Sequence, residues 1–159
     1  EYERIGYKEE IEKPKVNTLI KKPIVIKTKY DVKDKISESL LHEYILDDMD
    51  NFLKELGTGF AYIGHEVKIK IDNNYHSIDF LLYNYEFNLF VVCEIKVTKM
   101  KPEYIGQVLK YINYVDKNIK KAFQDNTVGI IICRNENEYV MEYSTNPNIF
   151  TTTYRLINN

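Results

Sequence analysis

Residues 89–97, with the sequence LFVVCEIKV, are the most informative segment of the chain. They form an apolar strand that is interrupted by two charged residues. Side chains of a strand alternate between its two faces, so Val92, Glu94 and Lys96 share one face. Burial of a charge costs several kcal/mol unless the charge is paired or coordinated. A simple Glu–Lys ion pair is one explanation of this strand, and a functional site is the other.

The preceding apolar strand adds a second carboxylate. Asp79 lies in SIDFLLY, and the polar residues 84–88 then form a turn. The midpoint between positions 79 and 94 falls inside this turn, so a hairpin without a bulge places Asp79 opposite Glu94, with Cβ atoms about 5 Å apart. Two carboxylates this close repel each other, and a hard cation with oxygen ligands, such as Mg²⁺, removes the conflict. With Lys96 on the same face, the pattern predicts metal-assisted hydrolysis of a phosphodiester.

The elements around this pair follow the order α-β-β-β-α-β with a small α-β tail, which predicts an α/β domain of three layers with a mixed central sheet. Apolar spacings of three and four predict one helix over residues 36–56, and a second helix begins at Pro102 and continues to Phe123. The lead-in, residues 1–33, contains two prolines and no sustained periodicity, so we place the domain at residues 34–159. The remaining expected elements are strands over 60–71, 77–83, 89–97, 127–133 and 150–157 and a short helix over 139–143.

Composition excludes several classes of protein. The 159 residues are 44% hydrophobic with a net charge of -2, which argues against a disordered chain and against a histone-like binder. The neutral total hides two basic runs, residues 13–35 and 96–121, on either side of an acidic run at 36–55. No apolar stretch approaches the roughly 18 residues of a membrane span, and no signal peptide or phosphate-binding GxxxxGK[ST] loop is present, so we expect a cytoplasmic protein that is not an NTPase. Cys93 and Cys133 lie in apolar runs without metal-ligand spacing; we expect reduced core thiols, with a disulfide as the alternative.

The ordered strings FLKELGTGFAYIG, SIDFLLYN, CEIKV and KPEYIGQVLKYI carry a resemblance to a known family. They resemble the YhcG-type branch of the PD-(D/E)XK nuclease superfamily, from about residue 36 to the end of the chain. The resemblance implies a restriction-endonuclease-like αβββαβ core, a DNA substrate and Mg²⁺ or Mn²⁺ as cofactor. It also implies an upstream helical region, of which EYERI would be the end, and the absence of an initial Met agrees with a piece of a longer protein. Dimers are common in the superfamily, so a homodimer is a further expectation.

The resemblance assigns roles residue by residue. Asp79 and Glu94 would bind the metal, Lys96 would orient the attacking water, and Gln107 on the following helix would contact phosphate or water. Ile78 replaces the proline that often precedes the first Asp. The fourth acid of the site stays open among Asp47, Asp48, Glu55 and Glu66.

Basic and aromatic residues near the second helix suit a nucleic-acid groove. We therefore expect DNA contacts from Lys99, Lys101, Tyr104, Lys110 and Tyr111, while each tyrosine taken alone is better explained as a cap on the core. The three histidines lack ligand spacing and are expected to be surface or structural residues.

Two alternatives to the nuclease remain. One is a catalytically silent DNA-binding or assembly module on the same fold. The other is an interaction domain in which Asp79, Glu94 and Lys96 form a structural salt bridge.

Overall fold

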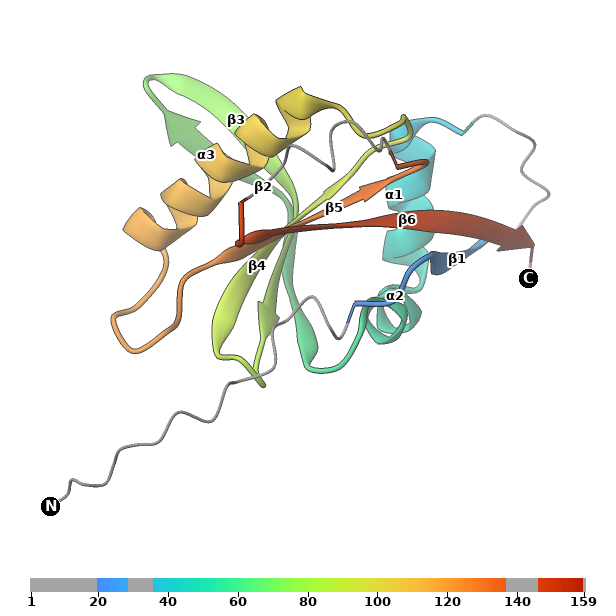
Figure 1. The fold of residues 1–159 in the computed structure, drawn as a ribbon, viewed down its shortest axis with the longest axis horizontal. Coiled ribbons are helices and arrows are strands. Elements are labelled where there is room, and N and C mark those ends of the chain that lie inside the picture. Colours follow the sequence, from blue (N-terminus) through green and yellow to red (C-terminus); the bar gives the residue numbers. More distant parts are fainter. Residues whose placement is uncertain (1–19, 29–35, 137–145, 159) are drawn as a thin grey trace, which may run out of the picture.

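The computed structural model describes residues 20–28, 36–136 and 146–158. They form a six-stranded mixed sheet in the order β1-β6-β5-β4-β3-β2 (Figure 1). The hairpin partners β2–β3 and β3–β4 are antiparallel, whereas β4–β5, β5–β6 and β1–β6 are parallel. The strands are β1 (Ile24–Thr28), β2 (Phe60–Ile71), β3 (Asn74–Asn84), β4 (Leu89–Ile95), β5 (Val128–Cys133) and β6 (Ile149–Asn158).

Helices cover both faces of this sheet. One buried cluster joins a face of the sheet to α1 (Glu38–Asp47) and α2 (Met49–Leu56), and a second cluster joins the other face to α3 (Pro102–Asn118). Figure 1 shows α3 on the side of the sheet opposite α1 and α2. The expected three-layer α/β architecture with a mixed sheet is therefore confirmed.

The expected single helix over residues 36–56 is wrong, because it is two helices that meet at Asp48. This residue has φ -141° and ψ 66°, and its side chain accepts a hydrogen bond from the backbone N–H of Asn51 at 3.2 Å. An aspartate that caps the N-terminus of a helix replaces the missing helical hydrogen bonds, so α2 restarts in a new direction.

Helix α3 begins at Pro102, as expected, but it ends at Asn118 rather than near Phe123. The backbone N–H groups of Ile119 and Lys120 both donate to the Val115 carbonyl, which closes the last turn. The Phe123 side chain is 75% exposed and does not extend the apolar face of the helix.

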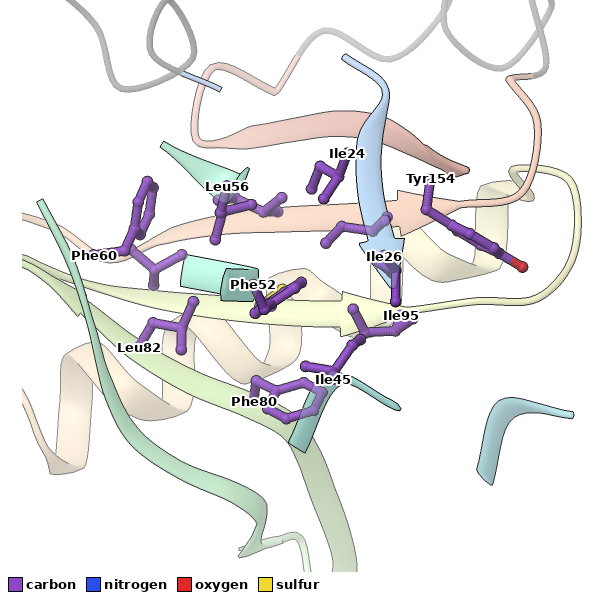
Figure 2. Packing of buried hydrophobic residues seen from close by; sticks show 14 of the residues in the cluster. Ile24, Ile26, Ile45, Phe52, Leu56, Phe60, Phe80, Leu82, Ile95 and Tyr154 are labelled. Atoms are coloured by element: carbon purple, nitrogen blue, oxygen red, sulfur yellow. The ribbon is translucent and has the colours of Figure 1, made fainter. Parts of the chain in front are cut away.

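The region expected to be a lead-in contributes a strand to the sheet. Strand β1 pairs in parallel with β6, and Ile24 and Ile26 are buried against the first two helices (Figure 2). Glu55 of α2 ties β1 down, since its carboxylate accepts hydrogen bonds from the Val25 N–H and from the Lys21 amino group, both at 2.9 Å. The sheet of the domain thus starts before the expected boundary at residue 34.

Cys93 and Cys133 are free, buried thiols in different core clusters, on opposite faces of the sheet. The alternative of a disulfide between them is therefore excluded. The expected short helix over residues 139–143 lies outside the described residues. None of the helices in the described ranges has the length and apolar character needed to span a bilayer.

Candidate active site

The hairpin register aligns the two carboxylates. Strands β3 and β4 pair from Phe80 opposite Cys93 to Asn84 opposite Leu89. The same register places Asp79 opposite Glu94, one step further along. The expected alignment of these carboxylates is therefore confirmed.

The two strands separate at this step, and the carboxylates fill the fork. Strand β3 continues to pair with β2 as far as Asn74, whereas β4 stays with β5. The backbone N–H of Asp79 donates to Glu94 Oε2 at 2.7 Å, and the N–H of Ile95 donates to Asp79 Oδ2 at 2.9 Å. Each carboxylate thus accepts a hydrogen bond from a backbone N–H of the other strand, in place of the carbonyl that would accept it in a continuous ladder. These hydrogen bonds fix both side chains in place.

Glu94 is the most perturbed acid of the site. The side chain is 1% exposed. Burial, followed by the nearby Asp79 carboxylate, raises the pKa of Glu94 to about 8, and Lys96 opposes this shift only in part. Neutralisation of the pair therefore requires a proton or a cation.

Lys96 follows directly after the last residue of β4, and its positive charge lies close enough to Glu94 to act on the pKa of that carboxyl. Its amino group lies 4.8 Å from the centroid of the Tyr104 ring and 4.0 Å from Glu38 Oε1. Within residues 20–28, 36–136 and 146–158, no acid except Glu38 comes within 4.0 Å of this amino group. A structural Glu94–Lys96 salt bridge is therefore not formed in the described part of the chain.

Tyr104 is held in turn by the hydroxyl of Thr98, at 2.5 Å from the tyrosine hydroxyl. The ring is then presented face-on to the Lys96 amino group, which a cation–π contact stabilises. Tyr104 thus contacts the expected catalytic lysine, a position that the sequence alone did not assign to it.

Gln107 and Tyr111 lie one helical turn apart on α3, beside the carboxylates. The Gln107 side-chain amide donates to the Tyr111 hydroxyl at 3.1 Å. Burial raises the pKa of Tyr111, and the charges of Glu94 and Asp79 raise it further, although the Gln107 hydrogen bond opposes them. Gln107 and Lys96 both line a hollow of about 510 Å³ beside α3, so the structure brings them together.

The expected DNA contacts divide into three groups. Lys110 and Tyr104 line the same hollow as Lys96. Lys99 and Lys101 are exposed before α3 and do not line it. Tyr111 also lines this hollow but is only 2% exposed, with its hydroxyl accepting from Gln107, so its contact with DNA stays a prediction.

Two of the four candidate acids have structural roles away from the fork. Asp48 caps α2, and Glu55 ties β1 to that helix. Asp47 and Glu66 are exposed, and Glu66 has a positive φ of 46°. Sequence reasoning missed the acid Glu38, which lies in the first turn of α1 beside Lys96. Its position at the start of the first helix could have indicated it.

His42 is a second residue that sequence reasoning missed. Its Nε2 atom is buried, makes no well-aligned hydrogen bond with the described residues and lies 3.5 Å from Asp79 Oδ2. Burial lowers the pKa of His42, but the direct contact with the Asp79 carboxylate, together with the charges of Asp79, Glu38 and Glu66, outweighs burial, so the pKa is raised overall. By contrast, His65 contacts Tyr62, and His76 packs its ring against Tyr111, as expected for structural residues.

The donors at the fork fit a divalent cation. Glu94 Oε1 and Asp79 Oδ1 make no hydrogen bond with the described residues, while the other oxygen of each is fixed by a backbone N–H. Carboxylate oxygens are the ligands that Mg²⁺ prefers. No group of three or more His, Cys, Asp or Glu side chains in the described ranges is arranged as a complete metal cage, so water and phosphate would have to complete the coordination.

Comparison with known proteins gives a family and a fold. The YhcG PDDEXK nuclease domain family matches residues 17–158. The protein named "Putative nuclease YhcG" from Escherichia coli (strain K12) is 27% identical over 114 residues, which are 72% of this chain and 30% of that protein. This chain thus spans less than a third of the length of that relative.

Two solved structures share the fold at low identity. One, described as the EndoMS-dsDNA2 complex, has a TM-score of 0.51 at 14% identity over 81% of this chain and 49% of that chain. The other, EndoMS in apo form, has a TM-score of 0.50 at 15% identity over 79% of this chain and 48% of that chain. Both comparisons show that this chain shares the arrangement of sheet and helices found in EndoMS.

Proposed function

The chain belongs to the YhcG PDDEXK nuclease domain family, and from this we propose that it hydrolyses DNA phosphodiester bonds with a divalent cation held by Asp79 and Glu94. The observation that carries the proposal is the pair of fixed carboxylates at the fork of β3 and β4. One of them, Glu94, is buried, and the nearby Lys96 offsets the rise of its pKa only in part. Lys96, two residues after Glu94, lies against the Tyr104 ring and lines the neighbouring hollow.

Magnesium or manganese suits the oxygen donors of this site. When bound, the ion would act as a Lewis acid on the phosphate and neutralise charge that builds up there. The backbone N–H groups of Asp79 and Ile95 hold the two carboxylates in place before any ligand arrives. A preorganised site of this kind avoids the cost of reorganisation during the reaction.

Lys96 and Gln107 are the proposed partners of the phosphate and the attacking water. Lys96 would donate a hydrogen bond from its amino group and stabilise negative charge as it develops. The contact with the Tyr104 ring limits the positions that this amino group can take. Gln107 would use its side-chain amide in the same hollow, with Tyr111 fixing its orientation.

DNA is the proposed substrate because the match covers a nuclease domain and because EndoMS, which has this fold, is described in a complex with double-stranded DNA. A homodimer, an upstream region of the same protein and a cytoplasmic location remain predictions.

The test is cleavage of plasmid and branched DNA in the presence of Mg²⁺ or Mn²⁺. Asp79→Ala and Lys96→Ala should lower the rate by roughly 100-fold or more, because each removes a group that acts on the reacting phosphate. Lys54→Ala is the matched control, since Lys54 is exposed on α2 and forms an ion pair with Asp50 one turn away. Equal rates in all four proteins would contradict the proposal.

A catalytically silent DNA-binding module is the second candidate, and the lack of a complete three-residue metal cage in the described ranges favours it. Salt-sensitive DNA binding without cleavage by any variant or metal would support this candidate. Cleavage that depends on Asp79 and Lys96 would exclude it.

A further inference from the structure

A groove runs along α3 and starts beside Lys96 and Gln107. Its first part is the hollow of about 510 Å³ that holds Lys96 and Gln107. Its second part is a hollow of about 470 Å³, and Lys110 lines both parts. The lining of the second part consists of Lys70, Ile71, Lys110, Asn113, Tyr114, Lys117 and Asn118.

The opposite wall of the groove is the arm of the β2–β3 hairpin that continues past β4. Ladder pairs extend along this arm from Val67 opposite Ile78 to Ile71 opposite Asn74. Buried Ile69 and Ile78 pack it against the α3 side of the core, so the wall is rigidly supported. Figure 1 shows the tip of this hairpin beside α3.

The second part of the groove is strongly basic. Three lysines line it, Lys70 from the arm and Lys110 and Lys117 from the helix, and no acid lines it. Lys110 and Lys117 are two helical turns apart, about 10.5 Å along the axis. A row of cations at this spacing complements a chain of phosphates rather than one isolated anion.

Aromatic and polar groups alternate with these charges. Tyr114 lines the second part, and Tyr104 and His76 line the first. Lys70 also lies 5.4 Å from the ring centroid of Tyr75, whose side chain is 75% exposed at the tip of the arm. Charged groups that follow a backbone, together with aromatic faces, are the features that bind single-stranded nucleic acid without sequence preference.

Gly106 supplies an independent observation. It lies inside α3, where glycine costs up to about 1 kcal/mol relative to alanine. A Cβ added there would meet no atom within 4 Å apart from its neighbours in the chain and the backbone of its own helix, so tertiary packing in the described part of the chain does not require glycine. Because Gly106 lines the hollow next to Gln107, its bare backbone leaves room for a ligand to approach the helix closely.

We propose that the groove between α3 and the β2–β3 arm binds a single strand of nucleic acid that leads away from the scissile phosphate, with its phosphates against Lys70, Lys110 and Lys117. The direction of the strand rests on the proposed function, because the reacting phosphate lies at the carboxylate pair. A single strand rather than a duplex is inferred because each hollow has the size of a small-ligand pocket and is walled on two sides.

The test compares two double variants of equal charge change. Lys70→Gln/Lys117→Gln removes two groove cations, and Lys27→Gln/Lys54→Gln removes two exposed cations from β1 and α2, on other parts of the surface. Fluorescence anisotropy measures the Kd for a labelled single strand and for a duplex at several salt concentrations, with EDTA present so that no cleavage occurs. Thermal midpoints confirm that both variants are folded.

The groove variant should bind the single strand roughly tenfold more weakly, and the slope of log Kd against log salt should fall by roughly 1.4, or 0.7 for each phosphate that is no longer neutralised by a lysine. The control should match the wild type. Equal weakening in both variants, or weakening confined to the duplex, would overturn the proposal. The cleavage assay distinguishes this proposal from the proposed nuclease function. If the groove variant binds more weakly but no protein cleaves DNA, only the nuclease function is contradicted. If the wild type cleaves DNA but the groove variant binds as tightly as the wild type, only the groove proposal is contradicted.

Discussion

At the level of single residues, Glu94 and Asp79 show what the sequence could predict. The alternation of side chains along each strand and the position of the turn were enough to align the two residues. No bulge interrupts the β3–β4 ladder between the turn and the fork. Glu38 and His42 could not be predicted, since their proximity to Lys96 and Asp79 depends on how α1 packs over the sheet. The burial of Tyr111 agrees with the explanation of this tyrosine as a cap on the core, but the helical pattern alone did not distinguish it from the more exposed Tyr104 and Tyr114.

The raised pKa of Glu94 predicts an unusual pH dependence of stability in the metal-free protein. With a folded-state pKa near 8 against an ordinary value of 4.5, the folded protein holds this proton more tightly than the unfolded protein. Its stabilising contribution is therefore complete below about pH 4.5 and is lost as the pH rises through 8, at no more than about 1.4 kcal/mol per pH unit.

Glu94→Gln should remove this dependence and leave the metal-free protein more stable than the wild type at pH 9, as measured by urea unfolding. Mn²⁺ should restore stability to the wild type and not to the variant. Glu43→Gln, at an exposed position of α1, is the matched control and should follow the wild type. If Glu94→Gln instead lowers stability at every pH, the carboxylate is part of a structural ion pair.

At the level of elements, the strongly periodic segments were predicted, but only some of their ends were, such as the bounds of β2 and the start of α3. The apolar spacing of residues 36–56 continues through Asp48, so only the capping geometry reveals the break between α1 and α2. Strand β1 was missed because its partner, β6, lies more than a hundred residues away, and a local pattern carries no information on such a distant pairing. Helix α3 was predicted from its buried stripe of Val108, Ile112 and Val115.

The contact between α3 and β5 depends on Gly129. A Cβ at this position would lie 2.3 Å from Val108 Cγ1 and 3.1 Å from Ile112 Cδ1. Gly129→Ala should therefore push the helix outward and lower the free energy of unfolding by about 1–3 kcal/mol. Gly106→Ala adds the same methyl group where space is open, and it should be neutral or stabilising by up to about 1 kcal/mol. Chemical denaturation checks both; equal stability of the two variants would contradict the close packing of α3.

At the level of the whole molecule, the arrangement of charge is more informative than its sum. A net charge of -2 gave no indication of a nucleic-acid partner. The fold places Lys110 and Lys117 of the basic run 96–121 together with Lys70 of the hairpin arm, beside a hollow that Lys96 and Gln107 line. The fold thus brings Lys70 of the hairpin arm close to lysines of α3, although these residues lie about forty positions apart in the sequence.

The most direct test of this account is a crystal structure of the protein soaked in Mn²⁺, with data collected at the manganese absorption edge. The account predicts an anomalous peak at the fork of β3 and β4, within coordination distance of both Asp79 and Glu94, and no such peak in Glu94→Gln. Manganese bound elsewhere, with the fork empty in the wild type, would contradict the assignment of the carboxylate pair as a metal site.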